Sequence, residues 1–293
     1  MPYVCFMTIH EAGRQLSTQL LLLYDEREAA NIAGWVMERI TGFTKIDRVI
    51  NKAFPLNPKQ QRLLKTYTTD LMNHKPVQYV LNEAWFYGMK LYVDENVLIP
   101  RPETEELADW IVKEVDSSRV TDGHPQVLDI GTGSGCIALA LKKGLPRANV
   151  YGCDISAGAL AVARRNAGAQ QLDIHFRQLD FLSATARVEL PAVDVLVSNP
   201  PYIPVKDKAT MAANVLNHEP HLALFVTNND PLQYYKAIAA FAKEKLRPGG
   251  SIYLEIYEES GNTVLDLFRQ NGFEHTMLKK DLQGRNRMVK ASL

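Results

Sequence analysis

The 293-residue sequence contains only three cysteines, which lie far apart at Cys5, Cys136 and Cys153. Their number is odd and no Cys-x-x-Cys pair occurs, which excludes a disulfide framework and a cysteine-based zinc site. We interpret Cys136 and Cys153 as small core residues, because both stand in apolar surroundings. This use of cysteine is typical of a reducing compartment, and we predict a cytoplasmic location.

An excess of charge of either sign is also missing. Lys+Arg and Asp+Glu both number 33, whereas proteins that bind nucleic acid broadly usually carry a basic excess. No apolar run approaches the ~20 residues of a membrane span. Residues 1–10 lack the basic segment and apolar core of a secretory signal. We therefore expect no membrane association and no direct binding of nucleic acid.

Start signals of several helices are present in residues 1–80. Thr8 and Glu11 have the spacing of a capping box, and Asn57 directly precedes Pro58, a cap followed by proline at the first helical position. We predict four or five short helices that form a small separate domain. This domain holds no evident catalytic cluster, so it is either a substrate-recognition module or a packing module.

The pattern changes after residue 80. Residues 81–102 contain β-prone runs around Gly88, and we predict a β-hairpin connector. Residues 103–293 alternate strands with helices, which predicts an α/β domain with a largely parallel, doubly wound sheet. The strands are expected at 126–130, 149–153, 173–178, 193–198, 251–256, 273–277 and 287–290.

A glycine-rich loop, Gly131-Thr132-Gly133-Ser134-Gly135, follows the first of these strands. The dinucleotide-binding fingerprint requires glycine at position 136, where this chain has Cys136, so the loop does not match that fingerprint. Asp154 ends the second strand, where a carboxylate can accept hydrogen bonds from both hydroxyls of a ribose. The alternative is that Asp154 only caps the next helix. Asp180 and Phe181 follow the third strand and offer an acceptor and an aromatic face to an adenine. The pattern indicates a nucleoside-binding site that lacks a pyrophosphate-binding loop. S-adenosylmethionine, a nucleoside without a pyrophosphate, fits such a site.

The fourth strand ends in Asn199-Pro200-Pro201-Tyr202. Two prolines cannot continue a strand, so the chain leaves the sheet at the edge where open α/β sheets bind ligands. The Asn199 side-chain carbonyl, the Pro200 backbone carbonyl and the flat Tyr202 ring suit a planar NH₂ group, in an amide or a nucleobase. The alternative is a rigid turn without a chemical role.

Two further segments occur in order with the motifs above: Pro100-Arg101-Pro102-Glu103-Thr104-Glu105 and Glu219-Pro220. With this set of motifs, the chain resembles the peptide chain release factor N5-glutamine methyltransferase family. The resemblance covers nearly everything from residue 55 onward. It implies a seven-stranded, Rossmann-like class I methyltransferase sheet with a small N-terminal helical domain and a connecting hairpin. It also implies methylation of the glutamine in the Gly-Gly-Gln motif of class-1 release factors, with S-adenosylhomocysteine as the other product. We expect a monomer.

The resemblance also assigns roles to residues. It places Gly131, Thr132, Gly133, Ser134, Gly135, Asp154, Phe181 and Asn199 in the cofactor site, to which Asp180 is added from its position after the third strand. The substrate glutamine is held by Asn199, Pro200, Pro201 and Tyr202, with Arg101 as a further substrate-binding residue, and Asn199, Pro200 and Tyr202 are the catalytic group. No metal is expected.

Three other functions share parts of this pattern. A sister enzyme would methylate a glutamine of a ribosomal protein with the same motif. An adenine-N6 methyltransferase would act on a nucleobase amine, which is also a planar NH₂ group. A silent adaptor would bind S-adenosylmethionine without turnover.

Overall fold

A computed structural model of the chain describes residues 7–115 and 123–293. Cys5 and most of the loop expected at residues 117–125 therefore lie outside the described residues. The described chain divides into two compact units, one of residues 7–82 with 212–218 and one of residues 83–211 with 219–293, apart from residues 116–122. Each unit is described by itself below.

The smaller unit contains short helices, as the sequence predicts, and two of them begin at the predicted caps Thr8 and Asn57. The helices are α1 (Ile9–Leu20), α2 (Glu26–Thr41), α3 (Lys45–Ile50), α4 (Pro58–Met72) and α5 (Val77–Leu81). Thr8 and Glu11 form the expected capping box, in which each side chain accepts the other's backbone N–H, at 3.2 and 2.9 Å. Asn57 caps α4 in the same way, through Gln60. The apolar faces of α1, α2, α4 and α5 share one core, to which α3 contributes no buried residue.

A distant segment, α10 (Ala213–His218), also belongs to this unit. A ring nitrogen of His218 lies 3.0 Å from the carbonyl oxygen of Asn73. The sequence pattern did not predict this, because a helix of six residues carries too little periodicity to show where it packs.

The predicted hairpin is present in the larger unit as β1 (Ala84–Phe86) and β2 (Met89–Leu91), paired antiparallel. Within the predicted connector, residues 84–86 and 89–91 form the strands, whereas residues 97–99 form none. Asp94 organises a turn there: its side chain accepts the Asn96 N–H at 3.0 Å, and its carbonyl accepts the Val97 N–H at 3.1 Å. The side chains of Val97 and Ile99 are buried without strand pairing.

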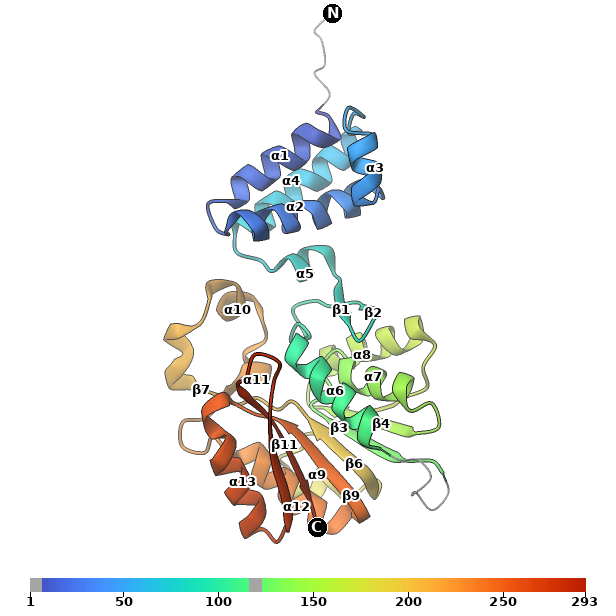
Figure 1. Cartoon of the computed structure of the whole chain (residues 1–293), viewed down its shortest axis with the longest axis vertical. Helices are drawn as coiled ribbons and strands as arrows, with labels where there is room; N and C mark the ends of the chain where they lie inside the picture. Colours follow the sequence, from blue (N-terminus) through green and yellow to red (C-terminus); the bar gives the residue numbers. More distant parts are fainter. Residues whose placement is uncertain (1–6, 116–122) are drawn as a thin grey trace, which may run out of the picture. The chain divides into compact units, whose positions relative to one another are not determined.

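A seven-stranded sheet in the order β10-β11-β9-β6-β3-β4-β5 forms the centre of the larger unit (Figure 1). β11 runs antiparallel to both of its neighbours, while the pairs from β9 to β5 are parallel. The strands are β3 (Gln126–Ile130), β4 (Asn149–Asp154), β5 (His175–Gln178), β6 (Val193–Ser198), β9 (Leu246–Glu255), β10 (His275–Lys280) and β11 (Asn286–Ser292). The predicted fold class, a class I methyltransferase sheet with an N-terminal helical region, is confirmed.

Helices flank this sheet (Figure 1). The longer ones are α6 (Pro102–Glu114), α7 (Cys136–Gly144), α8 (Ala157–Gln170), α12 (Gln233–Lys245) and α13 (Gly261–Gln270). A short 3-10 helix, η3 (Glu258–Ser260), directly precedes α13. Short elements not anticipated from the sequence are α9 (Ala184–Arg187), β7 (Ile203–Pro204), η2 (Val205–Thr210), α11 (His221–Leu224) and β8 (Phe225–Val226).

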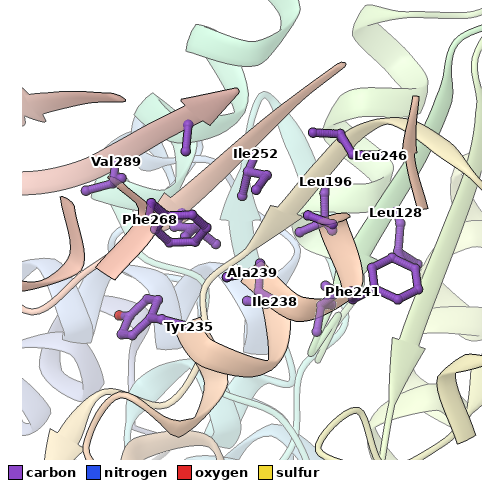
Figure 2. Packing of buried hydrophobic residues seen from close by; sticks show 14 of the residues in the cluster. Leu128, Leu196, Tyr235, Ile238, Ala239, Phe241, Leu246, Ile252, Phe268 and Val289 are labelled. Atoms are coloured by element: carbon purple, nitrogen blue, oxygen red, sulfur yellow. The ribbon is translucent and has the colours of Figure 1, made fainter. Parts of the chain in front are cut away.

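Alternating strand residues divide the core between the two faces of the sheet, as the two-residue period of a strand requires. Leu128 and Leu196 join α12 and α13 on one face, where Figure 2 shows Phe241 and Phe268 among the packed side chains. Their neighbours Val127, Val195 and Val197 join α6 and α7 on the other face. Because helices cover both faces of the sheet, a ligand can bind at the carboxyl ends of the strands, where the loops that follow them form the site.

Candidate active site

The loops that follow β3, β4, β5 and β6 open onto one pocket. Its lining includes eleven of the residues selected from the sequence: Arg101, Gly131, Thr132, Gly133, Ser134, Asp154, Asp180, Phe181, Asn199, Pro200 and Pro201. Residues adjoining them in the pocket but not selected are Thr104, Cys136, Pro220, Leu222, Ala223 and Tyr234, among others. Of the described residues that were selected, Gly135 and Tyr202 do not line the pocket.

Asp154 ties the glycine loop to the second strand. Its Oδ2 accepts the Gly133 N–H at 2.9 Å and its Oδ1 accepts the Ser156 N–H at 2.9 Å. Ser156 in turn caps α8. Burial raises the pKa of the Asp154 carboxyl above its ordinary value, although the backbone N–H groups oppose that rise. Each carboxylate oxygen has further acceptor capacity, so the capping contact and a ribose contact are compatible.

Gly135 shapes the loop from behind. Its φ of 81° is left-handed, and an added Cβ would lie 3.2 Å from the Ala163 Cβ. We expect Gly135→Ala to lower the free energy of unfolding by about 1–3 kcal/mol, because strain and overpacking act together. Urea unfolding measures this. Gly168→Ala is the matched control: Gly168 lies within α8, and no described atom is within 4 Å of its added Cβ.

The control should change stability in the opposite direction, by up to about 1 kcal/mol, because alanine is the better helix former. Equal effects of the two substitutions would contradict the strained loop.

Asp129 lies fully buried under the glycine loop. Its Oδ2 accepts the Thr132 hydroxyl at 2.7 Å and the Ala138 N–H at 3.2 Å. Among the described residues, neither its Oδ1 nor the Ser134 Oγ has a hydrogen-bond partner. Burial raises the pKa of Asp129 to about 7. Since buried polar atoms are normally paired, the unpaired Ser134 Oγ in the pocket wall fits a polar ligand.

Asp180 and Phe181 differ in accessibility. Asp180 is exposed, and its Oδ1 accepts the Leu182 N–H at 2.9 Å. Phe181 is buried, with its ring edge-to-face on Phe241 at 5.5 Å and the Arg187 guanidinium 5.2 Å from its centroid. Phe181 is therefore a rigid wall of the pocket rather than an exposed stacking platform.

Asn199 begins a chain of hydrogen bonds that leads away from the pocket. Its Nδ2 donates to the Thr104 Oγ1 at 3.2 Å, and the Thr104 hydroxyl donates to the Glu255 Oε2 at 2.6 Å. The Tyr202 hydroxyl donates to the other Glu255 oxygen at 3.2 Å. The Tyr202 ring lies 6.1 Å from that of Tyr257. Both ends of the Asn-Pro-Pro-Tyr turn are thus linked to the buried Glu255 carboxylate, Tyr202 directly and Asn199 through Thr104.

Arg101 reaches the pocket from the extended segment before α6. Its Nη2 donates to the Glu219 Oε1 at 2.5 Å, while the Glu219 Oε2 accepts the Ile99 N–H at 3.2 Å. Glu219 is buried, whereas about a third of the Arg101 side chain is exposed (36%). The guanidinium is therefore held in place, and among residues 7–115 and 123–293 its remaining N–H groups have no partner and can bind a ligand.

Sequence reasoning missed the roles of Thr104, Glu219, Tyr234 and Glu255 in this arrangement. One signal was available for Glu255, because it ends an apolar strand at the same edge of the sheet as Asp154. Thr104 and Glu219 lay within recognised motifs, but their partners are more than a hundred residues away in the sequence. No local pattern reports such contacts.

The described residues, 7–115 and 123–293, contain no group of three or more His, Cys, Asp or Glu side chains placed to hold a metal ion. Within the same residues, no helix has the length and apolarity needed to cross a membrane.

Comparison with known proteins identifies the class. Residues 111–227 match the family model described as the methyltransferase small domain. The fold is similar to the catalytic domain of hMettl16, solved in complex with the MAT2A 3'UTR hairpin 6, with a TM-score of 0.53 and 13% identity over 80% of this chain and 82% of that one. The fold is thus that of the class I methyltransferases.

Two relatives identify the family. The release factor glutamine methyltransferase of Flavobacterium psychrophilum is 39% identical over 289 residues, 98% of this chain and 99% of the relative. The protein of the same name from Streptococcus pneumoniae is 44% identical over 232 residues, 79% of this chain and 80% of the relative. The chain belongs to the release factor glutamine methyltransferase family.

Proposed function

We propose that this enzyme transfers a methyl group from S-adenosylmethionine to N5 of the glutamine in the Gly-Gly-Gln motif of class-1 peptide chain release factors. One observation carries the proposal: Asn199, Pro200 and Pro201 line the same pocket as the glycine loop and Asp154. An acceptor pair for a planar amide therefore stands beside a nucleoside-type site. The names of the relatives agree with this substrate.

The residues of the pocket fit S-adenosylmethionine. Asp154 would hold the ribose hydroxyls, Asp180 would accept the adenine amine, and Phe181 would form the wall beside the base. The unpaired Ser134 Oγ and the backbone of the glycine loop would receive the polar amino-acid end. When bound, the cofactor supplies an electrophilic methyl group.

The protein's own contribution to the reaction is the handling of the glutamine amide. An amide nitrogen is a weak nucleophile, since its lone pair is delocalised into the carbonyl. The Asn199 Oδ1 and the Pro200 carbonyl would each accept one N–H of the substrate, which orients the nitrogen and favours its rehybridisation. Such positioning supplies ~7–11 kcal/mol in favourable cases. The two acceptors also stabilise the positive charge that develops on nitrogen.

No general base is required before methyl transfer, because the additional proton becomes acidic once the new bond has formed. Tyr202 is fastened to Glu255 and lies outside the lining of the described pocket. Its proposed contact with the glutamine therefore involves the ring of a side chain whose hydroxyl is already fixed. Arg101, oriented by Glu219, is proposed to bind the protein substrate near the pocket mouth.

We assign recognition of the release factor to the helical unit and to the hairpin. The enzyme would act in the cytoplasm, because its proposed substrate works on the ribosome. As proposed, it forms no direct contact with nucleic acid.

The test uses S-adenosylmethionine labelled in its methyl group and a purified bacterial class-1 release factor. A second sample contains the same factor with the Gly-Gly-Gln glutamine changed to alanine. We expect label in the first protein and none in the second. Equal labelling would reject the assigned residue, and labelling of a ribosomal protein alone would reassign the substrate.

A further inference from the structure

Glu255 is a buried carboxylate to which the proposed function assigns only the fixing of the Tyr202 hydroxyl. It ends β9, is 2% exposed, and accepts two hydroxyl protons, from Thr104 at 2.6 Å and from Tyr202 at 3.2 Å. The Tyr235 hydroxyl donates to its backbone carbonyl at 3.1 Å. Burying a carboxylate costs folding free energy unless hydrogen bonds compensate the charge, so these hydroxyl partners matter to the arrangement.

The hydroxyl of Thr104 determines how the Asn199 amide is oriented. A hydroxyl has one proton to donate, and the Thr104 proton is directed at Glu255. Toward Asn199, Thr104 is therefore an acceptor, and only the NH₂ end of the amide matches it at 3.2 Å. The carbonyl end of the amide is then left for a ligand. A reversed amide would present two donors to the substrate nitrogen, whose two N–H groups are themselves donors.

We propose that Thr104 and Glu255 are positioning residues for methyl transfer, which fix the Asn199 amide with its carbonyl oxygen toward the substrate nitrogen. This inference rests on the proposed function, since it assigns to Asn199 the role of acceptor. Glu255 acts through the hydroxyls of Thr104 and Tyr202 and does not itself line the pocket.

Protonation of Glu255 would reverse the chain of hydrogen bonds. The titratable and charged groups around this carboxyl are Glu103, Cys136, Tyr202, Tyr235 and Arg287. Burial raises the pKa of Glu255 to about 7, against the lowering effect of the Thr104 and Tyr202 hydroxyls and the Arg287 charge. The protonated carboxyl donates to Thr104, whose own proton is then free for the Asn199 carbonyl. Turnover should therefore fall as the pH drops below about 7.

The experiment compares the wild-type enzyme with Thr104→Val and Thr104→Ser on a release factor. Valine keeps the shape of threonine but neither donates nor accepts, whereas serine keeps the hydroxyl. We expect Thr104→Val to lower kcat about tenfold, with the Kd of S-adenosylmethionine unchanged and the loss of turnover below pH ~7 abolished. Thr104→Ser should restore kcat to within about threefold of wild type and restore the pH profile.

Each result decides the proposal. A wild-type kcat for Thr104→Val would overturn it, as would a Thr104→Ser enzyme that is as slow as the valine variant, because packing alone would then explain the residue. A Thr104→Val enzyme that keeps the wild-type pH profile would also overturn it. If the wild-type enzyme methylates a ribosomal protein instead of the release factor, the proposed substrate is wrong. The same three enzymes, compared on that protein, then decide the positioning role by the same criteria.

Discussion

Changing Asn199 to alanine is expected to lower kcat about 10²–10³-fold, the range observed when one preorganised polar group is removed from a transition-state site. The reason is geometric. Asn199 stands at the end of β6, its NH₂ group is bound to Thr104, and its carbonyl oxygen is the side-chain acceptor for the substrate amide. Alanine removes that acceptor and leaves the backbone turn intact. Rapid-quench measurement of methyl transfer separates this loss from slow product release.

The affinity for S-adenosylmethionine serves as the internal reference for this variant. It should stay within about threefold of wild type if Asn199 acts mainly on the glutamine. Asn149→Ala is the matched control, because Asn149 is an exposed asparagine at the beginning of β4, the opposite end of the sheet. A full kcat for Asn199→Ala would refute the proposed handling of the amide. Parallel loss of turnover and cofactor affinity would instead assign Asn199 chiefly to the cofactor.

Asp154→Asn is expected to raise the Kd of S-adenosylmethionine roughly tenfold to a hundredfold, since hydrogen bonds to a charged group contribute about 1.5–3 kcal/mol. The new NH₂ group would face a backbone donor, either the Gly133 or the Ser156 N–H, where the carboxylate accepts both. The glycine loop would lose its tie to β4, and a ribose would lose a charged acceptor. Isothermal titration calorimetry measures this change.

The matched control is Asp173→Asn, which makes the same substitution at an exposed aspartate before β5. It should leave the Kd unchanged. Unaltered affinity in Asp154→Asn would show that Asp154 only caps α8, the alternative that its contact with Ser156 also permits. At saturating cofactor, kcat of Asp154→Asn should recover more than kcat of Asn199→Ala, because the two residues are proposed to act on different ligands.

Much of the fold was predictable because its signals are local. The capping boxes at Thr8 and Asn57 fixed two helix starts, and the apolar run of β6 was located to the residue by the prolines that follow it. The glycine loop, Asp154 and Asn199 were predictable as one site for a related reason. Each stands at the carboxyl end of a parallel strand, and such ends meet at one edge of a sheet.

The parts that escaped prediction depend on long-range contacts. The partner of Arg101 is Glu219, and the partner of Thr104 is Glu255; neither pair leaves a pattern in the sequence. The sequence also does not show how deeply the Glu255 carboxyl is buried, so its raised pKa could not be inferred. Phe181 was expected as an open aromatic face, but packing against Phe241 makes it a wall. The α10 segment joins the helical unit across more than a hundred residues of intervening chain.

The central claim is that the pocket delivers a methyl group to an amide nitrogen. The most direct measurement is tandem mass spectrometry of the release-factor peptide that contains Gly-Gly-Gln, after reaction with the wild-type enzyme and S-adenosylmethionine. We expect one added methyl group on the side-chain nitrogen of the glutamine. A methyl group on any other residue of the peptide, or on the backbone, would contradict the amide-binding role of Asn199 and Pro200.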